Sequence, residues 1–177
     1  MIIRLLAILF ASISLSAETF MIEDLKEARS DWLPFSDQVM GGESEVNFYE
    51  MEEEGLSFYR LEGNVSTKNN GGFIQFRTEA SFPNTDFSGI RIKTRGNNEE
   101  YFIFIRTPAT VLPWNYYSAS FRATEDWESI EISFSEFKKS SFILPRKVKS
   151  SKIRSIGIVA FGKDHFAQVD VAQVELY

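Results

Sequence analysis

From residue 46 to the C-terminus, the chain consists of short apolar segments separated by residues that favour turns. Residues 90–95 alternate apolar or small side chains with basic ones, and this period of two predicts a half-buried strand. Residues 101–105 are apolar at every position, which predicts a central strand that is covered on both faces. About eight or nine such segments predict an all-β fold, an antiparallel β-sandwich or jelly roll.

Three local patterns refine this prediction. The acidic run at residues 50–55, between apolar segments 46–49 and 56–61, predicts a β-hairpin. The apolar positions of the last strand slip by one residue, which predicts a β-bulge near Ala172 and Gln173. Only residues 22–32 have a spacing close to that of a helix, so we expect a short helix or an irregular arm there. No repeat or linker divides residues 18–177, which we expect to form one domain.

Residues 1–17 have the order of features that is typical of a secretory signal peptide. Arg4 precedes an apolar run that extends from Leu5 to Leu15, and Ala17 offers a small residue for cleavage. The run is shorter than the roughly 20 apolar residues that cross a bilayer. We therefore predict a cleavable signal, a periplasmic or secreted protein, and no stable membrane insertion after cleavage. An uncleaved anchor or a buried first helix is the alternative.

Composition excludes several kinds of chemistry. The chain has 25 acidic and 19 basic residues, and its basic residues look scattered, which disfavours nucleic acid and anionic lipid as partners. The absence of cysteine excludes thiol catalysis and cysteine-based metal sites. The single histidine, His165, falls in an expected turn and has no second histidine to complete a metal site. No motif predicts a cofactor or a metal, although loop carbonyls and Asp side chains could bind calcium.

Two glycine-rich loops are the first candidate site. Residues 37–44 and 69–73 each contain a double glycine between polar residues. Such glycines either form tight turns or let backbone amides approach a partner closely. If the loops meet in space, we expect one partner-binding cluster made of Asp37, Met40, Gly41, Gly42, Asn69, Asn70, Gly71 and Gly72.

An aromatic group after Pro113 is the second candidate site. Trp114, Tyr116 and Tyr117 could form a ligand platform for a sugar or a protein, because flat amphipathic rings bind both. The alternative is that Trp114 and one of the tyrosines cap one end of the sandwich.

The order of several motifs resembles one known family. Residues 37–44, with the sequence DQVMGGES, are similar to the "D-x-V-M-G-G-x-S" signature of the complex I intermediate-associated protein 30 family. Further similar segments follow in order at residues 61–73, 87–101, 121–137 and 153–158, so that the resemblance covers residues 32–177. It implies a β-sandwich like that of galactose-binding domains and a non-catalytic role in assembling respiratory complex I. It supplies no catalytic residues.

Three functional hypotheses follow. The leading one is a non-catalytic binding module that assists assembly or stability of an envelope or membrane protein complex. The alternative is a carbohydrate-binding β-sandwich of the periplasm or secreted fraction. The third is a hydrolase that uses Asp37 or Glu43 near the glycine loops, which no catalytic signature supports.

Overall fold

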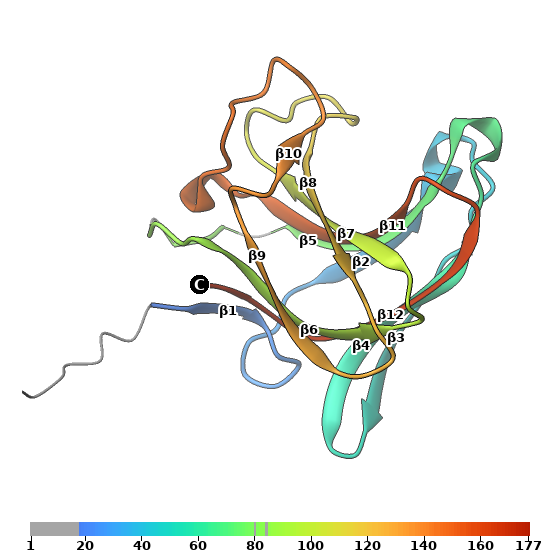
Figure 1. Ribbon diagram of the computed structural model, residues 1–177, viewed down its shortest axis with the longest axis horizontal. Helices are drawn as coiled ribbons and strands as arrows, with labels where there is room; N and C mark the ends of the chain where they lie inside the picture. The colour runs from blue at the N-terminus through green and yellow to red at the C-terminus, as the bar shows by residue number, and fades with distance from the viewer. Residues whose placement is uncertain (1–17, 80, 84) are drawn as a thin grey trace, which may run out of the picture.

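The computed structural model describes residues 18–79, 81–83 and 85–177, and the predicted signal peptide at residues 1–17 lies outside the described residues. Two antiparallel sheets pack face to face (Figure 1). This arrangement confirms the predicted all-β antiparallel sandwich. Among the described residues, no helix is both long and apolar enough to cross a membrane.

The two sheets, named sheet A and sheet B here, each combine strands from both halves of the chain. Sheet A has the order β3 (Asn47–Glu53), β4 (Leu56–Val65), β12 (His165–Leu176), β6 (Gly89–Gly96) and β9 (Glu128–Ser133), and β1 (Phe20–Glu23) pairs with β12. Sheet B has the order β10 (Lys138–Lys139), β8 (Tyr117–Arg122), β7 (Glu100–Arg106), β11 (Ser155–Phe161), β5 (Phe73–Glu79) and β2 (Trp32–Ser36). Short 3-10 helices η1 (Asp37–Met40), η2 (Lys68–Asn70) and η3 (Ser150–Lys152) lie in the connections.

The core lies between the sheets and follows the alternation in the sequence. Ile90 and Ile92 of β6 point inward from sheet A, and Ile103 and Ile105 of β7 point inward from sheet B. All four side chains are fully buried. Because successive side chains of a strand point to opposite faces, this register also fixes which residues lie on each outer face.

The local predictions have mixed outcomes. The β3–β4 hairpin is confirmed, and its turn places Glu54 and Gly55 at positive φ. The bulge is also confirmed, because the pairing of β12 with β6 shifts between Val171 and Gln173. Residues 24–31 form an irregular arm between β1 and β2, and residues 22–32 contain no helix.

Glu23 explains why that arm is irregular. Its buried carboxylate accepts hydrogen bonds from the amides of Leu25 and Ser30 and from the indole nitrogen of Trp32. These bonds fold the chain back on itself and satisfy amides that a helix would otherwise pair along its axis.

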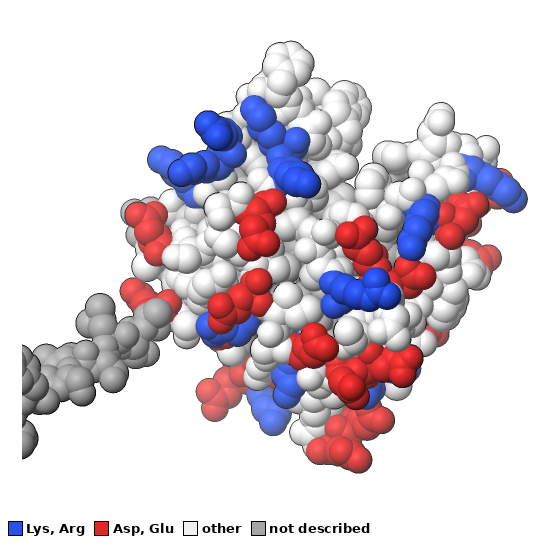
Figure 2. All heavy atoms as spheres, viewed as in Figure 1, with Lys and Arg blue, Asp and Glu red and all other residues white. Residues whose placement is uncertain are grey.

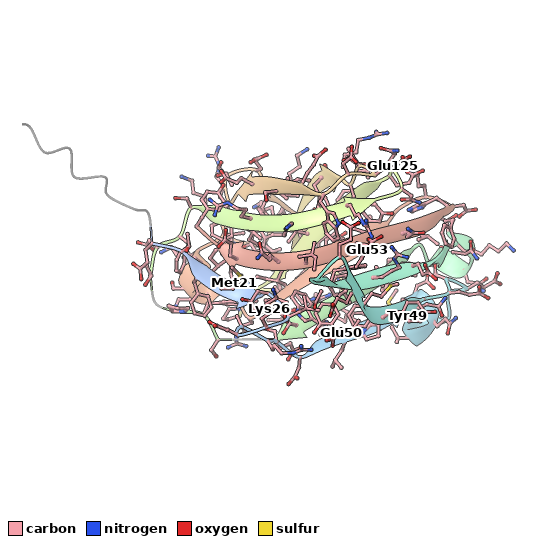
Figure 3. The ribbon with its side chains drawn as sticks, turned by 90° about the horizontal axis from the view of Figure 1, so that it is seen from below. Met21, Lys26, Tyr49, Glu50, Glu53 and Glu125 are labelled. Atoms are coloured by element: carbon pink, nitrogen blue, oxygen red, sulfur yellow. The ribbon has the colours of Figure 1, made fainter. Side chains whose placement is uncertain are left out.

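The outer face of sheet A is covered by paired charges. The Asp170 carboxylate accepts two hydrogen bonds from Arg60, both 2.7 Å long, and one of 2.8 Å from Arg95. Both guanidinium groups lie over the buried ring of Phe58. Arg95 also pairs with Glu53, the last residue of β3, which is labelled in Figure 3. This face therefore leaves few groups free for a ligand.

Candidate functional site: the outer face of sheet B

The outer face of sheet B carries aromatic side chains in place of ion pairs. Because Ile103 and Ile105 point into the core, Phe102 and Phe104 of β7 point outward. The pairing places Phe161 of β11 directly opposite Phe73 of β5. We call this surface the aromatic face, and its outward-facing residues are Leu33, Phe35, Phe73, Gln75, Arg77, Phe102, Phe104, Tyr116, Ser118, Ser120, Gly157, Val159 and Phe161.

The rings form a continuous series across the sheet. The Phe161 ring lies 6.0 Å from that of Phe102 and 5.7 Å from that of Phe104. Phe104 in turn stacks on Tyr116, with ring centres 4.1 Å apart and ring planes 10° from parallel. This stack buries most of Phe104. Phe161 remains more than one-third exposed, so the series keeps an apolar surface open to a ligand.

A second aromatic pair extends the face toward β2. The rings of Phe35 and Phe73 meet edge to face with centres 6.0 Å apart. The Arg77 guanidinium lies 4.8 Å above the Phe35 ring, which is the geometry of a cation–π interaction. Arg77 also pairs with Glu79 at 3.3 Å. This side of the face thus combines apolar rings with a positive charge.

A buried glycine lies in the middle of the face, where side chains of the neighbouring strand leave little room for a Cβ atom. Gly157 lies between Phe104 and Arg77 on the neighbouring strands. A Cβ atom at this position would lie 3.1 Å from Oε1 of Gln75 and 3.3 Å from Cβ of Arg77. The surface is hollowed between two raised lobes in Figure 2. At the β8 edge it continues into a hollow of about 480 Å³ lined by Phe102, Ser118, Ala119, Ser120, Ser135, Glu136, Phe137 and Lys138.

This face explains the apolar pattern of residues 101–105. The structure confirms that β7 is an interior strand of its sheet, between β8 and β11. Only its inner face lies in the core, and the expectation that both faces are covered is wrong. Phe102 is half-buried by neighbouring rings on the side that faces solvent.

The two glycine-rich loops do meet in space, and Asp37 joins them. Its fully buried carboxylate accepts hydrogen bonds from the amide and hydroxyl of Ser44, at 2.9 and 2.5 Å. From the other loop it accepts the amides of Gly72 and Phe73, at 2.5 and 3.2 Å. Burial acts to raise the pKa of Asp37, but these hydrogen bonds outweigh it and lower the pKa. Asp37 therefore holds the loops together as a carboxylate.

The glycines give Asp37 the space that it needs. A Cβ atom on Gly42 would lie 2.3 Å from the Asp37 carboxyl group, and one on Gly71 would lie 2.4 Å from it. Gly72 adopts a φ of 123°, which side chains disfavour. The tight-turn interpretation therefore accounts for Gly72, and the close approach of Asp37 accounts for Gly42 and Gly71.

The remaining residues of the predicted cluster lie at the surface. Met40, Gly41, Asn69 and Asn70 are exposed, and the Asn69 amide donates to the Glu43 carboxylate at 3.3 Å. Because Gly72 accepts the amide of Gly162 and Phe73 begins β5, the cluster forms one end of the aromatic face. Asp37 cannot serve the hydrolase hypothesis, since it is inaccessible and its oxygens are already bonded.

The three residues of the predicted ligand platform lie in three different environments. Trp114 is exposed on the loop between β7 and β8, and Tyr116 belongs to the aromatic face through its stack with Phe104. Tyr117 is not part of the aromatic face, because its ring is buried in the core and its hydroxyl donates to the Pro145 carbonyl at 3.0 Å. The alternation of the strand that begins at Tyr117 decides this difference.

Arg106 fixes the loop that carries Trp114. Its guanidinium donates to the carbonyl of Pro113 at 2.6 Å and to that of Asn115 at 3.4 Å. Burial, and secondarily the charge of Arg77, lower the pKa of Arg106. This loop forms the end of the aromatic face opposite the glycine loops (Figure 1).

No metal centre is built from the described residues. They contain no group of three or more His, Asp or Glu side chains placed to hold an ion. His165 is the first residue of β12, directly after the expected turn, and its Nδ1 lies 2.9 Å from the Lys163 carbonyl.

The fold is similar to that of several solved carbohydrate-binding modules. The family 11 module from Clostridium thermocellum, in complex with a β-1,3-1,4-mixed-linked tetrasaccharide, has a TM-score of 0.71 at 16% identity, over 89% of this chain and 94% of that one. A family 30 carbohydrate-binding module has a TM-score of 0.63 at 13% identity, over 91% of this chain and 99% of that one. At these identities the likeness shows the fold. No match was found among curated proteins.

The sequence also matches a family model over residues 21–169, which is most of the chain. This match includes both glycine loops and most of the aromatic face. It confirms the resemblance that the order of motifs in the sequence had indicated. The chain therefore belongs to the complex I intermediate-associated protein 30 family.

Proposed function

We propose that this protein is a non-catalytic binding module whose aromatic face holds an apolar segment of a partner protein in an envelope or membrane complex. The observation that carries the proposal is the series of phenylalanine rings that β2, β5, β7 and β11 contribute to one open sheet face. Folded domains rarely leave such a contiguous apolar surface to water unless a partner covers it.

The chemistry of the face favours a protein over a sugar. Phenylalanine rings offer contact area without a hydroxyl or an amide to bond a glycan. The two nearby arginines are already engaged, since Arg77 pairs with Glu79 and Arg106 donates to loop carbonyls. Aromatic residues and arginine are enriched at protein interfaces, where a few anchors supply most of the binding free energy.

The edge of the face offers further apolar area. Leu33 of β2 is two-thirds exposed and lies opposite Arg77 in the pairing of β2 with β5. Membership of a family named for association with complex I intermediates supports a role in assembly or stability of a protein complex. The absence of an available acid or base at Asp37 supports a role without catalysis.

Carbohydrate binding is the second candidate. Trp114 is exposed next to the Tyr116–Phe104 stack, and Ser118 and Ser120 add hydroxyls at the same end of the face. A ring with adjacent hydroxyls can stack on a pyranose and orient it. The similar fold of the family 11 module, which was solved with a tetrasaccharide, supports testing this ligand class.

Site-specific photocrosslinking tests the protein-binding proposal. A photoreactive phenylalanine analogue replaces Phe161 on the aromatic face, and a matched variant carries it at Lys93 on the outer face of sheet A. We expect a crosslink to one envelope protein from position 161 and none from position 93. Equal crosslinking from both positions, or none from either in intact cells, would contradict the proposal.

Tryptophan fluorescence tests the carbohydrate alternative. A glucan panel is titrated against the wild-type protein and a Trp114→Phe variant. A saturable change that the variant loses, together with no crosslink from position 161, would favour the carbohydrate candidate. We expect no such change.

We also propose that the protein acts outside the cytoplasm, on the basis of the signal-like features of residues 1–17. The intact mass of protein purified from cells that express the full chain tests this. A mass that corresponds to residues 18–177, with recovery from the periplasm or medium, is expected. An intact N-terminus with cytoplasmic recovery would refute it.

A further inference from the structure

Two neighbouring loops present an apolar tip beyond the aromatic face. Phe142 is 90% exposed, Val111 82% and Trp114 66%, and Ile143 and Leu112 are also exposed. We call these five residues the apolar tip. Large apolar side chains with this exposure are unfavourable in water when they gather at one place.

Hydrogen bonds hold the two loops of the apolar tip together. The Ser140 hydroxyl donates to the Trp114 carbonyl and accepts the Tyr116 amide, both at 2.9 Å. The Lys139 ammonium donates to the carbonyls of Phe142 and Leu144, also at 2.9 Å. The exposed side chains therefore project from a fixed scaffold, which lowers the entropy lost on docking.

A basic segment surrounds this tip. Residues 138–154 contain Lys138, Lys139, Arg146, Lys147, Lys149, Lys152 and Arg154, with no Asp or Glu from residue 137 to residue 163. All seven side chains are exposed, and none pairs with a carboxylate of the residues that the structure describes. The expectation that the basic residues are scattered is therefore wrong for this end of the molecule. Figure 2 shows the blue side chains on the upper lobe, and red side chains gathered over the lower part.

Three of these lysines line a hollow beside the tip. Lys147, Lys149 and Lys152 surround a space of about 390 Å³ that is otherwise formed by Thr107, Pro108, Ala109, Tyr117 and Pro145. The hollow is mostly apolar with ammonium groups around it. A phosphate of a lipid headgroup has the charge to pair with these ammonium groups.

We propose that the apolar tip docks on the surface of an anionic lipid bilayer, with Phe142, Ile143 and Trp114 at the headgroup–acyl boundary. The lysines of residues 138–152 then contact headgroup phosphates. Apolar side chains on a basic surface are the combination that gives reversible interfacial binding, because each contribution is weak by itself. The acidic β3–β4 hairpin lies at the opposite end of the molecule (Figure 1), so the charge distribution also orients it.

Docking in this way would place the aromatic face next to the membrane. Tyr116 belongs to that face, and its backbone bonds to Ser140 of the tip scaffold. A partner segment that emerges from the bilayer would then reach the aromatic face directly. The docking itself does not rest on the proposed function, because it uses different residues and a different ligand.

Flotation with lipid vesicles tests the proposal. Protein purified after expression of the full chain is mixed with two kinds of vesicle. The neutral vesicles contain phosphatidylcholine alone, and the anionic vesicles contain phosphatidylcholine with 40% phosphatidylglycerol. All variants are compared in the same N-terminal form, verified by mass, because residues 1–17 are themselves apolar. We expect binding to the anionic vesicles, a blue shift of the tryptophan emission to which Trp114 contributes, and weakening of the binding by added salt.

Matched pairs of variants separate the contributions of the apolar tip and of the lysines to vesicle binding from the effects of substitution elsewhere on the surface. Phe142→Ser with Ile143→Ser, and Lys147→Glu with Lys149→Glu, should each weaken vesicle binding by about tenfold or more. Their controls, Tyr49→Ser with Met51→Ser and Lys26→Glu with Arg122→Glu, make the same kinds of change at exposed residues elsewhere and should leave binding within about twofold.

Three outcomes would overturn the proposal. The wild-type protein could fail to bind anionic vesicles, or the tip variants could bind like their controls. Alternatively, binding could depend on the lysines but not on the tip and be abolished by polyglutamate, which would indicate an acidic protein as the partner of the basic segment.

Discussion

The two outer faces of this sandwich are built from the same kind of strand and differ in what their side chains contact. On sheet A, Asp170 has no access to solvent and bonds to both Arg60 and Arg95. On sheet B, the rings of Phe161 and Phe102 meet edge to face and remain partly open. A face whose charges are paired is already complete, whereas an open apolar face gains free energy when a partner covers it.

The difference shows that burial on an outer face has two causes. Phe58 on sheet A is buried by the guanidinium groups above it and by Trp127, whose ring centre lies 5.4 Å away. Phe104 on sheet B is buried by Tyr116 and Phe161, which leaves apolar atoms at the surface. The degree of burial of these two phenylalanines does not distinguish the faces, because it is similar on both. We therefore assign the binding function to sheet B, where the side chains that cover the buried ring are themselves apolar.

The largest effect is expected from breaking the charge network of sheet A. Asp170→Ala removes the buried carboxylate that Arg60 and Arg95 share over Phe58 and leaves Arg95 with Glu53 alone, so it should lower the free energy of unfolding by about 3–5 kcal/mol. Urea denaturation measures this loss. Glu53→Gln removes only a peripheral partner of Arg95 and should cost less than about 1 kcal/mol. Equal losses in both variants would show that the network is not organised around Asp170.

The next effect concerns the glycine-loop end of the aromatic face. Asp37→Ala leaves the amides of Ser44, Gly72 and Phe73 without their acceptor and should lower the free energy of unfolding by about 2–4 kcal/mol. Amide hydrogen exchange should increase at these residues more than in β6. A variant as stable as the wild type would mean that water replaces the Asp37 carboxylate as the acceptor of these amides.

The sequence allowed the fold to be predicted well because apolar alternation reports directly on burial. The β3–β4 hairpin, the bulge in β12 and the interior position of β7 all follow from local spacing. The arm at residues 22–32 was left open because its shape depends on Glu23, whose carboxylate bonds to the amide of Ser30, seven residues away. Local periodicity contains no information about such a bond.

The site was predicted less completely, for a related reason. The glycine loops were singled out correctly as unusual, but only the structure shows that Asp37 joins them and that its role is internal. The aromatic face was missed because Phe102 and Phe104 looked like core residues. The apolar residues on both sides of β7 did indicate that its outer face is unusual. Whether that face lies under a second covering layer or is open can be decided only from the positions of the other strands.

A smaller change in stability, with a large change in binding, is expected from Phe161→Ser. Phe161 is more than one-third exposed, so the substitution should lower the free energy of unfolding by only about 1 kcal/mol. If the aromatic face anchors the partner, the loss of this ring should weaken partner binding by about 2 kcal/mol, or roughly 30-fold. Titration with the partner identified by crosslinking measures this.

Lys93→Ser on the outer face of sheet A is the matched control, since Lys93 has no ion pair among the described residues. It should change neither quantity measurably. An equal loss of partner affinity in both variants would place the interface elsewhere, and would remove the functional distinction between the two faces.

The smallest effect is a dependence of stability on pH that originates at the glycine loops. Hydrogen bonds lower the pKa of Asp37 in the folded state, so its contribution is fully present above the ordinary pKa of an aspartate, about 3.9, and is lost as the pH falls through the folded value. The difference in stability between wild type and Asp37→Asn should therefore shrink below pH 4. Other carboxylates titrate in both proteins and cancel. The amide chemical shift of Gly72, which donates to Asp37 at 2.5 Å, should titrate over the same range. A Gly72 shift that titrates above pH 4 would show that burial outweighs the hydrogen bonds at this end of the aromatic face.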